Sequence, residues 1–339
     1  MTIAVCILAK DEARTIDRCL RRLGAQSFIR QASQQIDIHV VANGCTDDTA
    51  AVASNGAALF DDTRATLHVH DLRPGGKSRS WNRAVHELTR ADADAFVFVD
   101  ADIKLANDNV IAGLLSVLES DPRLIACTGF PIKDVAVKAK KTLIDRFSLI
   151  VSKRTRHVGA INGSLYVARA TALRNIRLPD QTPGEDGFLN AMIATNGFTS
   201  AEDTSVIAAP GEPTHSFQAH GPLDYVGHER RMIVGTMINR WIFEHLWSLR
   251  LDEPAGPLIK QWNETDPDWV ERLIRQRAEK ARWLIPNAIL FYRFNGRRGR
   301  PLWKYAAYLP LAAVATLATV PPAVLANRRL KSLGAAETW

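Results

Sequence analysis

The sequence predicts an α/β protein with a mostly parallel sheet flanked by helices. Short apolar runs alternate with helical patterns in the order β-α-β-α-β over residues 3–99. Such alternation is typical of a parallel sheet with helices on both faces. The run Phe96–Val99 contains no polar residue, as expected for a strand buried on both faces. It leads directly into Asp100 and Asp102.

The individual elements follow from hydrophobic spacing and turn residues. Helices are expected from Asp11 onward with Ile16, Leu20 and Leu23 on one face, after Thr46 or Asp47, near Arg79–Thr89, and over Asn109–Glu119, Phe188–Asn196 and Asp266–Trp283. Strands are expected at Ile3–Leu8, Ile36–Val41, Thr66–His70, Phe96–Val99 and Leu124–Ile132, with another entered from the Gly-containing segment 159–169.

The sequence lacks the patterns that are typical of several kinds of binding site. No G-x-G-x-x-G turn follows the first strand, which counts against an NAD site, and the chain has no complete P-loop. The four cysteines are scattered and form no CxxC pair, so they favour reduced thiols over a zinc site or disulfides. Residues 2–9 resemble a first strand more than a signal peptide, because no basic region precedes them.

The net charge of +7 is concentrated late in the chain, where basic residues flank the apolar run Ala306–Ala326. This arrangement favours a membrane surface over nucleic acid as a partner. The run approaches the length of a bilayer span, but it is Ala-rich and interrupted by prolines. A span, a hairpin in one leaflet and a core helix are the alternatives, and the basic and aromatic flanks favour membrane association.

Two acidic motifs are candidates for chemistry. Side chains two residues apart on an extended chain point to the same side, so Asp100 and Asp102 could share a divalent cation, Mg²⁺ or Mn²⁺. An acidic loop that caps the next helix is the simpler alternative. Glu185 and Asp186 fall where a helix is expected to begin, and taken alone they are more typical of a plain N-cap.

Five segments stand out in order along the chain: Ile7–Glu12, Val40–Thr49, Gly75–Lys77 with Trp81-Asn82, Asp100–Asp102 and Glu185-Asp186. Together they resemble a family 2 glycosyltransferase with the GT-A fold, over about residues 2–241. Asp11 replaces an Asn in the first of them, and Ala42 and Asn43 replace two acids in the second. The distal Gln-x-x-Arg-Trp element has only a partial match without the Trp, at 228–232.

The resemblance implies a role for each matched residue. Asp186 would be the general base and Glu185 would position neighbouring groups. Asp102, with Asp100, would hold Mn²⁺ or Mg²⁺, and His215 or His220 could be a further ligand. Asp100 would also contact the ribose or Lys77. The donor, with a UDP-sugar favoured, would be bound by Ala9, Asp11, Glu12, Asn43, Lys77, Asp100, Arg230 and Arg231.

The expected function is therefore a metal-dependent, inverting glycosyltransferase acting on a lipid-linked or other membrane-proximal acceptor, at the cytoplasmic face of a membrane. The expected organisation is a GT-A domain at 1–245, a basic amphipathic helical region at 246–304 and a membrane-associating tail at 305–339. A sugar-1-phosphate nucleotidyltransferase is one alternative, although the first loop lacks the Gly-rich, basic sequence it would need. A non-catalytic membrane scaffold is the other.

Overall fold

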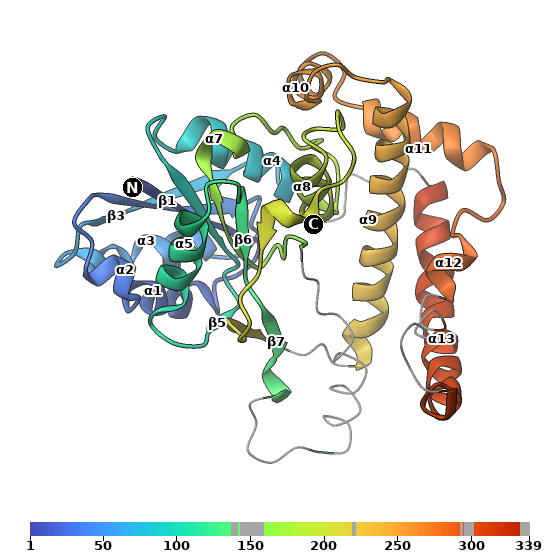
Figure 1. Cartoon of the computed structure of the whole chain (residues 1–339), viewed down its shortest axis with the longest axis horizontal. Coiled ribbons are helices and arrows are strands. Elements are labelled where there is room, and N and C mark those ends of the chain that lie inside the picture. Colours follow the sequence, from blue (N-terminus) through green and yellow to red (C-terminus); the bar gives the residue numbers. More distant parts are fainter. Residues whose placement is uncertain (137–141, 143–158, 219–221, 292–293, 295–301, 333–339) are drawn as a thin grey trace.

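A computed structural model describes residues 1–136, 142, 159–218, 222–291, 294 and 302–332 (Figure 1). Within them a seven-stranded sheet forms the centre of the molecule, in the order β3-β2-β1-β4-β8-β6-β9. All neighbouring pairs are parallel except those of β8, which runs antiparallel to both β4 and β6. The strands are β1 Ile3–Ala9, β2 Ile36–Asn43, β3 Ala65–Leu72, β4 Ala95–Val99, β6 Ala126–Thr128, β8 Leu165–Arg169 and β9 Ile207–Ala208.

A second, three-stranded sheet lies next to the first. It consists of β5 (Lys104–Leu105), β10 (His215–Phe217) and β7 (Pro131–Lys133). The single strand expected at Leu124–Ile132 is therefore wrong, because β6 and β7 belong to different sheets. The chain changes sheets at Gly129, where an added Cβ would lie 2.9 Å from a ring carbon of His215.

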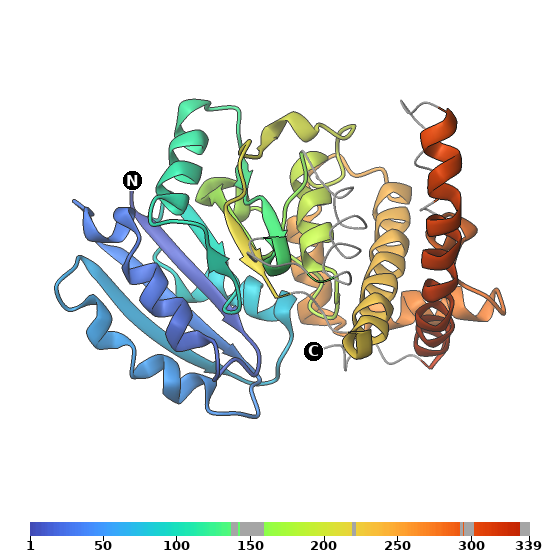
Figure 2. The same ribbon diagram turned by 90° about the horizontal axis from the view of Figure 1, so that it is seen from below.

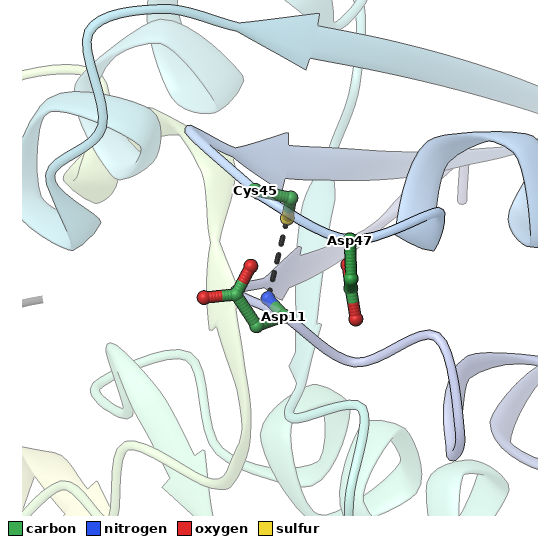
Figure 3. Close-up of side chains that lie close together, drawn as sticks. All are labelled: Asp11, Cys45 and Asp47. Carbon is green, nitrogen blue, oxygen red and sulfur yellow. Dashed lines mark hydrogen bonds between the residues drawn. The ribbon is translucent and has the colours of Figure 1, made fainter.

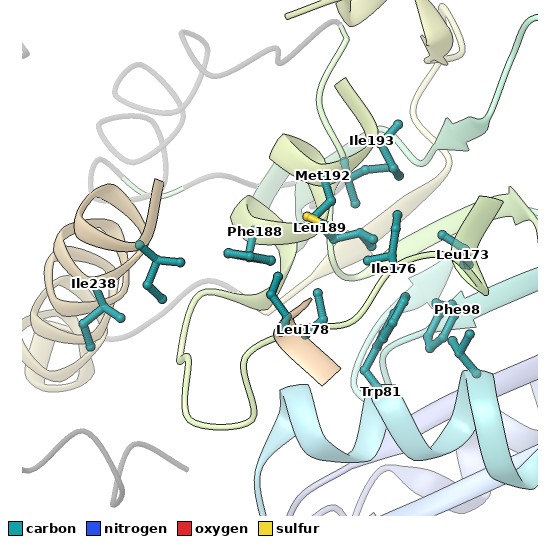
Figure 4. Packing of buried hydrophobic residues seen from close by; sticks show 14 of the residues in the cluster. Trp81, Phe98, Leu173, Ile176, Leu178, Phe188, Leu189, Met192, Ile193 and Ile238 are labelled. Atoms are coloured by element: carbon teal, nitrogen blue, oxygen red, sulfur yellow. The ribbon is translucent and has the colours of Figure 1, made fainter. Parts of the chain in front are cut away.

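Helices cover both faces of the large sheet (Figures 1 and 2). One face packs against α1, α3 and α5, and the other against α4, α7, α8 and α9. In Figure 4, Phe188 and Leu189 of α8 lie between Ile238 of α9 and Trp81 of α4. The helices on the sheet are α1 Ile16–Gly24, α2 Ser27–Arg30, α3 Thr49–Ser54, α4 Lys77–Arg83 with a π-helical continuation at Ala84–Leu88, α5 Val110–Ser120, α7 Ala170–Leu173, α8 Glu185–Ala194 and α9 Pro222–Ser248.

The remaining helices extend from the end of α9. They are α10 Gly256–Thr265, α11 Trp269–Glu279, α12 Asn287–Leu290 and α13 Leu302–Lys331. Figures 1 and 2 show α13 running beside α9 on the side away from the sheet. The α13 helix continues through Pro310, Pro321 and Pro322. No helix in the part of the chain that the structure describes meets the combined length and hydropathy needed to cross a bilayer.

Two helices begin later than the sequence pattern indicates. The first helix starts at Ile16, because Asp11 adopts a left-handed conformation (φ 55°) and the Glu12 and Ala13 amides bond to side chains at the start of α3 and in the loop before it. The helix expected from Asp266 starts at Trp269 and ends at Glu279. Asp266 instead ends α10, because its N–H donates to Trp262 O at 2.9 Å.

Candidate active site

The carboxyl ends of β1, β2 and β4 border a cleft of about 430 Å³. This edge is where parallel sheets place their ligands. Residues from the three strand ends line the cleft, together with the start of α4 and one side chain of α9. They are Leu8, Lys10, Asp11, Glu12, Asn43, Lys77, Asp100, Ala101, Asp102 and Arg231.

A buried lysine joins the two acidic motifs. Lys77 Nζ lies 2.7 Å from Glu185 Oε1 and 3.4 Å from Asp100 Oδ1, and its side chain is only 14% exposed. Burial lowers the pKa of Lys77, but the carboxylates of Asp100 and Glu185 outweigh burial and leave the pKa raised. Burial raises the pKa of both carboxyls, while Lys77 acts in the opposite direction. The three groups stabilise one another's charges.

Asp102 is exposed at the floor of the cleft, and among the described residues its carboxylate has no hydrogen-bond or ion-pair partner. The backbone on each side is held: Asp100 N donates to Ser164 O at 2.9 Å, and Ile103 is buried before β5. Glu12 lies nearby, and its pKa is raised by burial and by Asp102 and Asp100. Asp100, Asp102 and Glu12 thus line the same cleft, and carboxylate oxygens are the ligands that hard divalent cations prefer.

Asp186 is the second residue of α8, and its Oδ1 accepts a hydrogen bond from Gly187 N at 2.7 Å. A Cβ added to Gly163 would lie 3.0 Å from Asp186 Cβ, so the loop before β8 approaches it closely only because residue 163 is glycine. Asp186, Lys77, Asp100 and Glu185 also line one small cavity, which shares Lys77 and Asp100 with the cleft. The two acidic motifs therefore converge.

Of the remaining predicted site residues, some line the cleft and others do not. Arg231 of α9 lines the cleft, whereas Arg230 is exposed and is not part of the lining. His215 is buried, with its Nε2 2.7 Å from Ser164 Oγ and its Nδ1 2.9 Å from Thr214 Oγ1, so a metal would have to displace one of these partners. Burial lowers the pKa of His215 to about 4. His220 lies outside the described residues.

Asn43 has a supporting place at the wall of the cleft. Its Oδ1 accepts hydrogen bonds from Gly76 N at 2.6 Å and from Ser80 Oγ at 3.0 Å, and it thereby holds the start of α4. An amide at the end of β2 thus fixes the helix that carries Lys77. Ala9 is fully buried and does not line the cleft, although its carbonyl accepts a hydrogen bond from the Cys45 thiol.

Asp11, Cys45 and Asp47 lie together where two loops meet (Figure 3). Their ligand atoms are within 4.8 Å of one another, but each is already bonded to protein. Asp11 Oδ1 accepts from Thr46 N at 2.6 Å, Asp47 accepts from Ala13 N at 3.0 Å, and Cys45 Sγ accepts from Asp11 N at 3.3 Å. The cluster joins the β1–α1 loop to the β2–α3 loop, and Asp11 supports the cleft through this junction.

Leu8 and Lys10 also line the cleft, although the sequence did not mark them as site residues. The same is true of Asn239 of α9, whose amide holds the turn before Glu185. Asn239 lies between Ile238 and Arg240 in the sequence, and a polar residue beside a charged one on a helix gives no local signal of burial.

Residues 4–176 match the sequence model of the family described as Glycosyl transferase family 2. The chain belongs to this family. It is therefore a nucleotide-sugar glycosyltransferase, and the nucleotidyltransferase and scaffold alternatives are not supported. No curated protein sequence matches the chain.

Solved structures show a related fold. The mannosyltransferase PcManGT from Pyrobaculum calidifontis, in complex with GDP-Man and Mn²⁺, aligns with a TM-score of 0.54 at 17% identity, over 96% of this chain and 86% of that one. Glucosyl-3-phosphoglycerate synthase from Mycobacterium tuberculosis, in complex with Mn²⁺, UDP-Glc and phosphoglyceric acid, aligns with a TM-score of 0.48 at 17% identity, over 70% and 79%. The first similarity supports the GT-A fold, with its mixed, mostly parallel sheet.

Proposed function

We propose that this family 2 enzyme transfers a sugar from a nucleoside-diphosphate sugar to an acceptor hydroxyl, with inversion and with the help of a divalent cation. One observation carries the proposal. Two exposed or half-buried aspartates and an arginine from a distant helix line one cleft, and Lys77 and Asp100 connect it to a small cavity lined by the acidic motif Glu185-Asp186. The arrangement provides separate groups for the donor's diphosphate and for the acceptor's proton.

Asp102, with Asp100, would hold Mn²⁺ or Mg²⁺ against the donor's diphosphate. The cation would act there as a Lewis acid that offsets charge on the departing nucleoside diphosphate. Arg231 reaches the same cleft, and its guanidinium suits bidentate contact with phosphate oxygens. Lys10 adds a further positive charge to the cleft wall, besides Arg231 and Lys77.

Asp186 would accept the proton of the acceptor hydroxyl as that oxygen attacks the anomeric carbon. Glu185 is less suited to this role, because its carboxylate is buried and paired with Lys77 at 2.7 Å. A general base must lie within hydrogen-bond reach of the reacting oxygen. Only one of the two carboxylate oxygens of Asp186 is bonded to its own helix, which leaves the other for this contact. Asp186 is thus the base, and Glu185 orders its surroundings.

The donor site can be tested by thermal shift and turnover. UDP and GDP, each with and without Mn²⁺, are screened first, followed by UDP-glucose and GDP-mannose, with a UDP-sugar as the expected donor. Binding should raise the melting temperature only when the cation is present, since a ligand of the folded state stabilises it. Asp102→Asn should abolish this dependence, whereas Asp108→Asn, an exposed acid of the following loop, should preserve it. Cation-independent binding by both variants would refute the proposal.

We further propose that the acceptor is lipid-linked and that α13 lies on a membrane surface. The outward face of α13 presents a row of apolar side chains from Leu309 to Leu325, of which Leu317 is 70% and Val314 61% exposed. The row ends at Arg328 and Lys331, which could pair with anionic headgroups. Met232, which is also exposed, follows Arg231 on α9, the helix against which α13 packs.

Flotation with liposomes tests this surface. The protein should float with vesicles that contain anionic lipid, and Leu317→Glu should reduce flotation severalfold, because it places a charge in the apolar row. Gln261→Glu, on exposed α10, adds the same charge elsewhere and should not change binding. Equal flotation of both variants would contradict the proposal. The free, buried thiols of all four cysteines support a reducing compartment, and we propose the cytoplasmic face.

A further inference from the structure

One buried amide on α9 bridges the turn that precedes the base. Asn239 is only 6% exposed, and Ile238 and Trp241 on the same helix are also buried. Its Oδ1 accepts a hydrogen bond from Thr182 Oγ1 at 2.9 Å, and its Nδ2 donates one to Gly184 O at 2.7 Å. Both ends of the carboxamide therefore hold the turn 182–184.

This turn determines where α8 begins. Gly184 is the N-cap residue of α8, and its carbonyl also accepts a hydrogen bond from Phe188 N at 3.1 Å. Glu185 and Asp186 are the first two residues of the helix. The direction of the Asp186 side chain depends on the backbone that Asn239 holds.

The same turn is held from the opposite side by α4. Ser78 Oγ donates to Thr182 O at 2.9 Å, and Ser78 directly follows Lys77. Ser78 and Thr182 are both buried. The hydrogen bonds thus connect α4, the turn and α9, and a satisfied buried network of this kind favours one arrangement over others.

Glycines allow α9 to approach this closely. A Cβ at Gly184 would lie 2.7 Å from Asn239 Nδ2, and one at Gly235 would lie 3.4 Å from Gly184 Cα. The first distance is shorter than any Cβ contact tolerates, so the turn and the amide fit together only without a side chain at residue 184.

We propose that Asn239 is a positioning residue for the transfer step, which it serves by orienting Asp186 through the turn 182–184. The proposal rests on the function proposed above. Arg231 lies two turns earlier on the same helix, roughly 12 Å along its axis. The α9 helix therefore reaches both the donor's side of the cleft and the base, and Asn239 affects the base without touching the substrate.

Kinetics of substitutions at both ends of the bridge test this role. Asn239→Ala and Thr182→Val should each lower kcat at least tenfold while the dissociation constant of UDP with Mn²⁺, or of GDP if the screen selects it, stays within twofold. Thr182→Ser retains the hydroxyl and should restore kcat. The double variant Asn239→Ala/Thr182→Val should be no slower than either single variant, because both break the same bridge.

Asn327→Ala is the matched control. Asn327 is also a buried helix amide, and it bridges Leu284 N at 2.8 Å and Arg282 O at 3.3 Å, away from the cleft. It should lower the melting temperature without changing kcat. Equal kcat losses in Asn239→Ala and Asn327→Ala, or a parallel loss of nucleotide affinity, would overturn the proposal.

Amide hydrogen exchange separates this inference from the proposed function. Peptides that cover 185–190 should exchange faster in Asn239→Ala than in the wild type, and Asn327→Ala should leave them unchanged. If the wild type transfers no sugar from any donor, the proposed function fails. In that case faster exchange retains only the structural bridge, whereas unchanged exchange refutes the bridge as well.

Discussion

Lys77 decides the charge state of the candidate site. It lies between Asp100, which follows β4, and Glu185, which begins α8. Its charge counteracts the effect of burial, which raises the pKa of both carboxyls. Removing one partner of a buried ion pair is costly, because the remaining charge is left without compensation. The lysine thus supports the geometry of the site even before any substrate binds.

Lys77→Met should lower the free energy of unfolding by roughly 3–5 kcal/mol near neutral pH. The loss should be smaller at pH 5. Without the Lys77 ammonium group, Asp100 and Glu185 bind protons more tightly in the folded protein than in the unfolded chain. The stability of the variant therefore falls as the pH rises through the raised pKa values of these two carboxyls. Urea unfolding at pH 5 and pH 8 measures the difference. Lys260→Met, at an exposed lysine, provides the control, and a pH-independent loss would contradict the explanation.

Asp186→Asn should lower kcat by about 10²–10⁴-fold, the usual contribution of a general base. Nucleotide binding should stay unchanged, because Asp186 does not line the donor cleft. The amide keeps the shape of the side chain and its bond from Gly187, so the fold should be retained. Initial rates and UDP titrations provide the two measurements. A variant that retains most of its kcat would exclude Asp186 as the base.

Single residues of the site could be predicted where the signal is local. Asp100, Asp102 and Asp186 lie in short motifs at element ends, and the structure brings Asp100 and Asp186 to one cavity. The Lys77–Glu185 pair and the Asn239 bridge depend on contacts between distant parts of the chain. Spacing within a motif carries no information about such contacts.

At the scale of elements, three histidines stack across β2 and β3. His39 is buried, and its Nδ1 lies 3.1 Å from His70 Nε2, while its ring centroid is 4.8 Å from that of His68. Burial lowers the pKa of His39 to about 4, and His68 and His70 act in the same direction, against a weaker opposite effect of Asp37. His39 is consequently held neutral in the folded protein.

The pH dependence of stability should reflect this strand pair. Between pH 6.5 and about 4, His39 binds a proton in the unfolded chain but stays neutral in the folded protein. The free energy of unfolding therefore falls as the pH falls through this range. Each pKa unit corresponds to about 1.4 kcal/mol. His39→Leu should make this decline shallower in urea titrations over that window. A decline as steep as in the wild type would show that other groups cause it.

Element types were more predictable than their pairing. Strands β1, β2 and β4 appear where apolar runs predict them, because they are buried on both faces and need no partner information. The fourth parallel strand, β3, also appears where it is expected, although it lies at the edge of the sheet and is only partly buried. The reversed direction of β8 and the division of Leu124–Ile132 into β6 and β7 follow from pairing with later strands. The single α9 helix carries Arg230 and Arg231, and its length follows from packing against α8 and α13.

At the scale of the whole molecule, charge and apolar surface act together. The net charge of +7 should strengthen attachment of α13 to anionic vesicles. Flotation should therefore decline as salt rises from 50 to 500 mM, since exposed charges are screened over a shorter distance. Some binding should persist in high salt through the apolar row of α13. Binding that ignores both salt and lipid charge would contradict this combination.

The reversed strand β8 bears on how the enzyme assembles during its synthesis. Strands β1 to β4 are consecutive in the chain and adjacent in the sheet, so they can pair while the remainder is still being made. β8 must then insert between β4 and β6, which joins two segments made at different times. The cleft gains Arg231 only when α9 packs. A ribosome-bound fragment would thus contain the strand ends that line the donor cleft before Asp186 and Arg231 are in place. Catalytic competence would therefore arrive late in synthesis.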